Sequence, residues 1–361
     1  MISLGEAARR ISSSSAVAEP PLESGDRIDE FPRSASPVSH PGLVQVEEAR
    51  RRIAAIVKAT PLVPSPGLSR HAGVPVRLKG ESLQETGSFK VRGAANALLS
   101  LDPEQAAVGV VAASSGNHGK AVAHVARLLG VPATVCVSAR VPRHKVEAIE
   151  GLAAKVVVAG PDQDDADAEA RRLARQGLTL IHPFDDPEVI AGQGTIGLEI
   201  LEAFPECTVM VVPLSGGGLV SGIAAAAKGV APGIAVYGVS QERGPAMHAS
   251  LEAGRLVEVV EEDTLADALA GGLGQDNRHT FEMCRELLSG TVLVSEGEIA
   301  HAMAYLDDEH GWRAEGGGAV GVAALLEGRI PLDGPTAVVV SGGNVGDDTF
   351  RRALEAARRD G

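Results

Sequence analysis

The chain has 361 residues, of which 44% are hydrophobic, and its formal net charge is −14 at pH 7. This length and apolar content can bury a large core and usually fill more than one compact unit, so we expect two lobes. An acidic chain has no electrostatic reason to bind nucleic acid or an anionic membrane. The sequence also contains no run of about twenty apolar residues, the length that a membrane-spanning helix needs.

The first 42 residues differ from the rest of the chain. They contain four consecutive serines, Ser12 to Ser15, together with several prolines and mixed charges, and they have no apolar signal core. Such a segment buries too little apolar surface to offset its ordering entropy, so we predict a disordered or loosely attached tail over residues 1–42. The three cysteines, Cys136, Cys207 and Cys284, have no metal-like spacing, which predicts free buried thiols in a cytoplasmic protein and no bound metal.

Short β-rich runs alternate with helical runs from Val46 onward. After a first helix over Val46–Ile56, we predict strands at Val76–Leu78, Gly109–Ala113, Ala133–Val137, Lys155–Val158, Thr179–Ile181, Thr208–Pro213, Ala235–Val239, Thr291–Val294 and Thr336–Val340. Helices are predicted at Val91–Ser100, Lys120–Leu129, Pro142–Gly151, Ala166–Gln176, Gly194–Phe204, Val220–Gly229, Glu296–Asp308, Ala319–Leu326 and Phe350–Arg358. Continuous Val-rich strands that alternate with helices indicate an α/β fold with mostly parallel, twisted sheets flanked by helices.

Four strand-to-helix junctions are rich in small polar residues, and ligands of open α/β sheets bind at such junctions. They are Glu85–Lys90, Ser114–Gly119, Ser215–Leu219 and Ser341–Asn344. In the third, Gly216, Gly217 and Gly218 lack side chains, so backbone N–H groups can converge on a phosphate at the start of a helix. A G-x-G-x-x-G string at Gly192–Gly197 does not directly follow a strand, and we attribute it to close packing of its helix on the sheet rather than to dinucleotide binding.

Lys90 stands at the start of the predicted helix Val91–Ser100, among small or apolar neighbours and close to Arg92. Partial positive charge at the helix start, desolvation and the nearby arginine would each lower the pKa of the amine. A neutral lysine is what Schiff-base chemistry requires. A lysine beside a phosphate loop, without a metal or dinucleotide motif, indicates pyridoxal 5'-phosphate as the cofactor.

The segment Glu85–Ala94 resembles the cofactor-lysine signature of serine/threonine dehydratases and serine racemases, which belong to fold type II of the pyridoxal-phosphate enzymes. The other three junctions are similar to that family's carboxylate loop, tetraglycine phosphate loop and ring-nitrogen motif, in the family's order over about residues 45–355. The resemblance implies a large cofactor-binding domain at 43–81 and 190–361, and a small substrate-closing domain at 82–189. It also implies a homodimer.

The resemblance also assigns roles to single residues. Lys90 would form the Schiff base and later act as the base at the substrate Cα, and Ser115 would stand at the opposite face of Cα. Cofactor contacts would come from Phe89, Lys90, Asn117, Ser215, Gly216, Gly217, Gly218, Leu219, Glu315 and Ser341. Substrate carboxylate contacts would come from Ser114, Ser115, Asn117 and His118.

The implied reaction is an ammonia-lyase β-elimination on a small hydroxy-amino acid similar to threonine or serine, giving a 2-oxo acid and ammonia. Two segments, Ala270–Gly274 and Glu315–Ala319, look like a subgroup that takes part in hydroxyectoine utilisation, which would make the substrate a hydroxyectoine-derived amino acid. Amino-acid racemisation, β-replacement and a non-catalytic cofactor-binding protein are the alternatives. The acidic cluster expected after Ala235–Val239 for a cation is mostly missing at Ser240–Met247, so no metal is expected.

Overall fold

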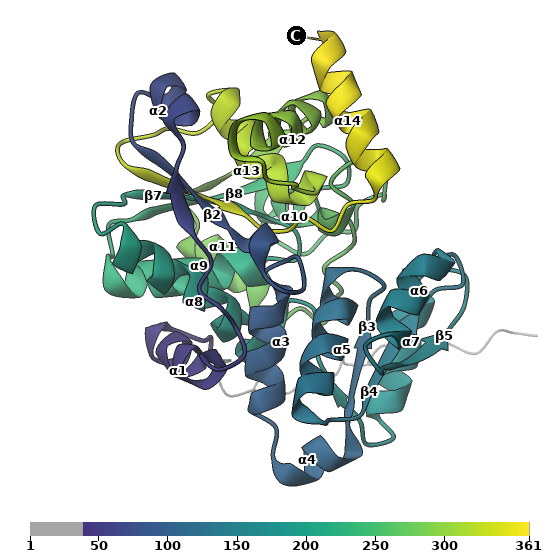
Figure 1. The fold of residues 1–361 in the computed structure, drawn as a ribbon. Helices are drawn as coiled ribbons and strands as arrows, with labels where there is room; N and C mark the ends of the chain where they lie inside the picture. Colours follow the sequence, from purple (N-terminus) through teal and green to yellow (C-terminus); the bar gives the residue numbers. More distant parts are fainter. Residues whose placement is uncertain (1–38, 361) are drawn as a thin grey trace, which may run out of the picture. The chain divides into compact units, whose positions relative to one another are not determined.

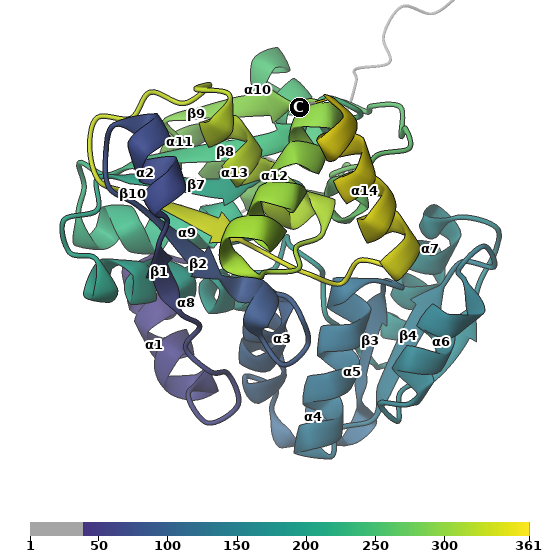
Figure 2. The same cartoon turned by 45° about the horizontal axis from the view of Figure 1, so that its top comes forward.

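The computed structural model describes residues 39–360, and their strands form two sheets. The tail predicted at residues 1–42 therefore lies outside the described residues, apart from its last four. The α/β class is confirmed, because both sheets are mostly parallel and are flanked by helices (Figures 1 and 2).

The larger sheet has six strands in the order β1-β2-β10-β7-β8-β9. The bounds are β1 Leu62–Pro64, β2 Val76–Gly80, β7 Val209–Pro213, β8 Ala235–Gln241, β9 Gly290–Val294 and β10 Thr336–Val340. β1 pairs antiparallel with β2, and every other pairing is parallel. The chain segments after β2, β7 and β10 consequently leave the sheet at one edge, where open α/β sheets bind ligands.

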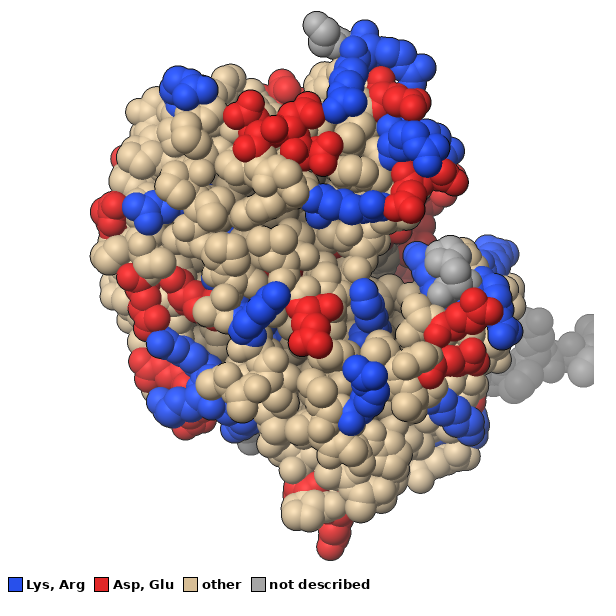
Figure 3. All heavy atoms as spheres, in the orientation of Figure 1, with Lys and Arg blue, Asp and Glu red and all other residues tan. Residues whose placement is uncertain are grey.

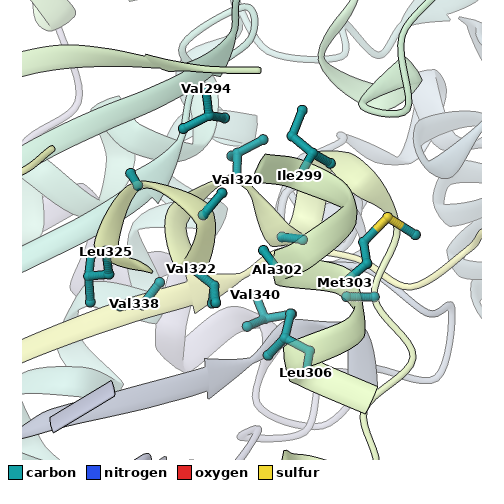
Figure 4. Close-up of a cluster of buried hydrophobic side chains, with 14 of the residues drawn as sticks. Val294, Ile299, Ala302, Met303, Leu306, Val320, Val322, Leu325, Val338 and Val340 are labelled. Atoms are coloured by element: carbon teal, nitrogen blue, oxygen red, sulfur yellow. The ribbon is translucent and has the colours of Figure 1, made fainter. Parts of the chain in front are cut away.

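Helices cover both faces of this sheet, because successive residues of a buried strand point to opposite sides. Val338 and Val340 pack with helices α12 (Glu296–His310), α13 (Gly316–Leu326) and α14 (Asp347–Asp360), a cluster shown in Figure 4. Ala337 and Val339 face the other way, onto a cluster supplied by helices α8 (Pro187–Ala203) and α9 (Gly218–Val230). The continuous apolar runs predicted this two-sided burial.

The smaller sheet is wholly parallel, with the order β5-β4-β3-β6. Its strands are β3 Val110–Ala113, β4 Ala133–Val137, β5 Lys155–Val158 and β6 Thr179–Leu180. Helices α3 (Lys90–Leu99) and α5 (Asn117–Leu129) pack on one face, and α7 (Gln163–Ala174) packs on the other. The strands divide between the sheets as the two-domain prediction requires, but the boundaries at 81/82 and 189/190 stay a prediction.

Several short elements were missed. They are β1, α2 (Pro66–Ala72), α4 (Pro103–Val108), α10 (Ala246–Ala253), α11 (Thr280–Leu287) and the 3₁₀ turns η1 (Glu81–Leu83) and η2 (Asp267–Leu269). The remaining helices, α1 (Leu43–Ile53) and α6 (Arg143–Glu150), lie close to their predicted positions. Elements of three to eight residues carry too few apolar positions for a period to stand out.

The glycines of the G-x-G-x-x-G string lie inside α8, as contacts between helices. A Cβ on Gly192 would stand 2.6 Å from the Arg92 carbonyl oxygen of α3, and one on Gly194 would stand 2.7 Å from the Gly222 carbonyl oxygen of α9. The predicted close packing is therefore present, but it is against helices α3 and α9 rather than against the sheet.

The surface carries charges of both signs. On the face shown in Figure 3, Lys and Arg are interspersed with Asp and Glu and form no broad basic area. The three cysteines are free and buried, as predicted. Among the described residues, no helix has the length and apolar character needed to cross a membrane.

Candidate active site

Lys90 begins helix α3 and points its amine at the backbone of a distant segment. Its Nζ donates a hydrogen bond of 2.7 Å to the carbonyl oxygen of Pro183, and it lies 5.2 Å from the centre of the Phe89 ring. Burial lowers the pKa of this amine from 10.5 to about 8, and the carboxylate of Glu315 opposes the shift. A substantial fraction of Lys90 is therefore neutral near pH 8.

The charge of Arg92 does not cause this shift, contrary to our prediction. Its buried guanidinium donates to Glu81 over two bonds of 2.8 Å, and to Glu199 over bonds of 2.6 and 2.8 Å. Two carboxylates thus neutralise Arg92, and desolvation remains as the cause of the lowered pKa of Lys90.

The lysine segment is joined to the segment after β10. The Phe89 N–H donates to the Ser341 carbonyl oxygen (3.0 Å), and the Gly343 N–H donates to the Gly87 carbonyl oxygen (2.9 Å). Gly87 has φ +78°, and a Cβ there would stand 2.4 Å from Oδ1 of Asn344, so both its backbone angle and its space require glycine. Ser341 is 4% exposed, and its Oγ lies 3.5 Å from the Gly317 carbonyl oxygen.

A polar network joins three of the four predicted junctions, because Asn344 Nδ2 donates to the Thr86 carbonyl oxygen (2.8 Å) as well as to Asn117. Asn117 Nδ2, at the start of α5, donates to Glu315 Oε1 (2.7 Å), and Asn117 Oδ1 accepts from Asn344 Nδ2 (2.6 Å). Burial, assisted by the negative charge of Asp267, raises the pKa of Glu315 to about 7. Glu315 is consequently a buried carboxyl that titrates near neutrality, close enough to Lys90 for each to shift the pKa of the other.

The fourth junction is the glycine loop between β7 and α9. Gly217 has φ +91° and precedes the first residue of α9, so the N–H groups of the first turn have no partner within the helix. A Cβ on Gly216 would stand 2.4 Å from the Phe184 ring, and one on Gly218 would stand 2.7 Å from the Phe184 carbonyl oxygen. Ser215 is half-buried, and Leu219 belongs to the core cluster against which Phe89 also packs. The loop can hold an anion, because its N–H groups meet the positive end of the helix dipole.

The predicted carboxylate residues lie in the turn after β3 and in the first turn of α5. Ser114 and Ser115 are half-buried, and Ser114 Oγ accepts from the Gly116 N–H (3.2 Å). His118 is 3% exposed, and its Nε2 lies 2.8 Å from the Ile181 carbonyl oxygen, so this nitrogen carries the proton. Burial, with the nearby charge of Lys90, lowers the pKa of His118 to about 3. Its ring is thus neutral, and an anion would meet its backbone N–H rather than a charged imidazole.

Residues 182–186, which we call the strap, were missed by sequence reasoning. The strap runs from β6 to α8, presents the Pro183 carbonyl to Lys90 and lays Phe184 against the glycine loop. One signal for it was available: Asp186 followed by Pro187 is a helix-start signature, and Asp186 accepts from two N–H groups of α8. Reading that signature would have moved the predicted helix start from Gly194 to Pro187.

A small cavity of about 80 Å³ is lined in part by the strap. Its lining comprises Ala113, Asp167, Ala170, Arg171, Leu180, His182, Pro183, Phe184 and Gly272–Gly274. Gly272–Gly274 in this lining belong to Ala270–Gly274, one of the two segments that look like the hydroxyectoine-utilisation subgroup. The other such segment, Glu315–Ala319, begins α13, where a Cβ on Gly316 would stand 2.2 Å from the Leu265 carbonyl oxygen.

Known proteins resemble this chain over most of its length. The family model described as "Pyridoxal-phosphate dependent enzyme" matches residues 53–342. A "Putative threonine dehydratase" of Sinorhizobium fredii is 48% identical over 324 residues, which cover 89% of this chain and 98% of that protein. An "L-threonine ammonia-lyase" of Thermotoga maritima is 43% identical over 314 residues, or 86% of this chain and 78% of the relative. The structure of maize serine racemase has a TM-score of 0.82 at 33% identity, covering 89% of this chain and 99% of the racemase.

Proposed function

This chain belongs to the pyridoxal-phosphate-dependent enzymes, within the threonine dehydratase family, and we propose that it converts a small hydroxy-amino acid such as threonine or serine into a 2-oxo acid and ammonia. The observation that carries the proposal is the Lys90 amine: its pKa is lowered to about 8, and its partner, the Pro183 carbonyl, belongs to the strap that also covers the glycine loop. This arrangement supports a single site that would supply a lysine for an aldehyde and a loop for a phosphate.

The residues fit the cofactor. We propose that N–H groups of Gly216, Gly217 and Gly218 hold its phosphate, with Ser215 and Leu219 completing the loop. Ser341 would offer a neutral hydroxyl to the ring nitrogen, and Asn117, Glu315 and Phe89 would also contact the ring. When bound, pyridoxal phosphate supplies an aldehyde for the substrate amine and a ring that accepts electron density from Cα.

The chain's own groups would then move the protons. Lys90 Nζ, neutral near pH 8, would take the Cα proton as general base, and its hydrogen bond to the Pro183 carbonyl would hold the amine in place. The N–H groups at the start of α5, with Ser114 and Ser115, would bind the carboxylate. Because Ser341 is neutral, it would not keep the ring nitrogen protonated, which favours prompt loss of the β-hydroxyl.

The proposal is tested by measuring 2-oxo acid release from a panel of amino acids. The panel contains L-threonine, L-serine, 3-hydroxyaspartate and ring-opened hydroxyectoine derivatives. We expect threonine or serine to give the highest kcat/KM. A preference for the hydroxyectoine derivatives would instead assign the chain to that catabolic role, and no release from any of them, with cofactor bound, would favour a non-catalytic protein.

Turnover should rise with pH along a limb near pH 8, because only the neutral Lys90 amine can accept the Cα proton. The Glu315 carboxylate raises the pKa of Lys90, so Glu315→Gln should move the limb to lower pH. The measurement is kcat against pH from about 6 to about 11 for both proteins, a range that includes the ordinary pKa of lysine. A limb near 10.5, the ordinary value for lysine, would contradict the role given to burial.

Racemisation is the second candidate activity, favoured by the likeness to maize serine racemase and by the place of Ser115 on the carboxylate loop. We expect the wild type to form some D-serine from L-serine. Ser115→Ala should remove D-serine formation while 2-oxo acid release continues. Chiral chromatography of the remaining serine distinguishes the two proteins, and equal D-serine from both would exclude a proton role for Ser115.

We also propose that the enzyme is a cytoplasmic homodimer whose smaller sheet forms a domain that closes on the substrate. Free buried thiols support the compartment, and the family resemblance supports the dimer and the two domains. Light scattering coupled to size-exclusion chromatography would measure the mass. A monomer with full activity would contradict the dimer.

A further inference from the structure

The strap, residues 182–186, is held from several sides by side chains that the proposed chemistry does not use. At its start, His118 donates to the Ile181 carbonyl oxygen, and His182 Nδ1 accepts from the N–H groups of Phe184 (3.3 Å) and Asp185 (2.8 Å). At its end, Asp186 accepts from the N–H groups of Glu188 and Val189.

The middle of the strap is fixed by the carboxylate of Asp185. Oδ1 accepts from the N–H groups of His279 (2.9 Å) and Thr280 (2.8 Å), and Oδ2 accepts from the N–H of Arg278 (2.6 Å). These donors lie at the start of α11, 93 to 95 residues away in sequence. Three backbone N–H groups on one carboxylate, assisted by the helix dipole, make a strong and directional attachment.

Both sides of this attachment touch the glycine loop. On the strap side, a Cβ on Gly216 would stand 2.4 Å from the Phe184 ring, and a Cβ on Gly218 would stand 2.7 Å from the Phe184 carbonyl oxygen. On the α11 side, a Cβ on Gly217 would stand 3.0 Å from Cβ of Thr280. One residue before Phe184, the Pro183 carbonyl accepts from Lys90 Nζ.

We propose that Asp185 is a positioning residue for the cofactor site. By joining the strap to α11, its carboxylate holds Phe184 and Thr280 against the glycine loop and keeps the Pro183 carbonyl opposite Lys90. Asp185 acts through these residues and does not itself touch the reacting atoms. The inference rests on the proposed function only in taking the glycine loop and Lys90 as the cofactor's binding groups.

The test measures cofactor retention by the holoenzyme, from the visible absorbance that remains after dilution to a series of protein concentrations. Asp185→Ala should raise the dissociation constant of pyridoxal phosphate by about tenfold or more, the change that accompanies loss of one charge-assisted hydrogen bond. Asp185→Asn keeps an oxygen for His279 and Thr280 but turns an N–H donor toward Arg278, so it should retain the cofactor better than Asp185→Ala and about threefold less well than wild type.

The matched control is Asp102→Ala, which removes a capping carboxylate of the same kind from α4, an element with no residue in the site. It should leave cofactor retention within about twofold of wild type, inside the usual range for a surface change away from a site. At saturating cofactor, Asp185→Ala should lower kcat with little change in the KM for threonine, because the carboxylate loop contacts the chain at Ile181, before the strap, and not at Asp185.

Urea unfolding of each protein separates positioning from a general loss of stability. A dissociation constant of Asp185→Ala within twofold of wild type, in a folded protein, would overturn the inference. If Asp185→Ala does not fold, Asp185→Asn decides: retention equal to wild type overturns the inference, and weaker retention supports it. Cofactor retention needs no substrate, so a wild type that retains the cofactor but releases no oxo acid would refute the proposed reaction alone.

Discussion

Replacing Lys90 with alanine should abolish 2-oxo acid release and the visible absorbance of the lysine-bound cofactor. In the proposed reaction, the variant loses both the amine that would bind the aldehyde and the base that would take the Cα proton. We expect kcat to fall by at least about a thousandfold, which corresponds to about 4 kcal/mol of transition-state stabilisation. Steady-state assays with threonine, together with an absorbance spectrum, measure both losses.

Lys155→Ala is the matched control for this variant. Lys155 is an exposed lysine at the start of β5, so its loss should change neither the spectrum nor the rate. A small primary amine added to Lys90→Ala should restore part of the turnover, because it supplies a diffusible base. Normal activity in Lys90→Ala would end the assignment of Lys90 as the cofactor lysine.

The sequence was sufficient for the elements that are long or uniformly apolar. The strands Ala133–Val137, Lys155–Val158 and Thr336–Val340 were predicted to the residue, because each is rich in Val, joined in two of them by Thr, and these β-branched residues favour strands. The antiparallel strand Leu62–Pro64 was missed, since three residues ending in proline resemble a loop.

The four junctions of the site were visible because small residues at strand ends are a local signal. The strap was not visible, because it acts through a backbone carbonyl and a carboxylate whose partners lie far away in sequence. Pro183 is 93 residues from Lys90, and no local pattern encodes that contact. The effect of Arg92 on Lys90 was mispredicted for the same reason, since its partner Glu199 lies 107 residues away.

Arg92 leads to the second large prediction, which concerns stability. Arg92→Leu should lower the free energy of unfolding by about 3–5 kcal/mol, because it leaves a buried carboxylate without its cation. Glu81 is fully buried and would keep its hydrogen bonds from Thr60 and Gln84 and the influence of the Lys79 charge, but no hydrogen-bonded cation. Glu199 would retain Lys79 at 2.5 Å. Urea unfolding of the holoenzyme at pH 7 measures the loss. The exposed ion pair of Arg143 with Glu147 gives the control, and Arg143→Ala should leave the midpoint nearly unchanged.

The pH dependence of this loss identifies its cause. Burial favours the neutral form of Glu81, but the charge and hydrogen bonds of Arg92, together with the charge of Lys79 and the hydrogen bond from Thr60, outweigh it and hold the pKa below 4.5. In the wild type, the stability contributed by Glu81 is therefore present above pH 4.5 and is lost only as the pH falls through the lowered pKa. In Arg92→Leu burial is no longer offset in this way, so the pKa of Glu81 should rise and the carboxyl should take up a proton as the pH falls from 7 to 5. The stability difference between the two proteins should then shrink over that range, whereas a difference that stays constant would mean that lost packing, and not an unpaired charge, destabilises the variant.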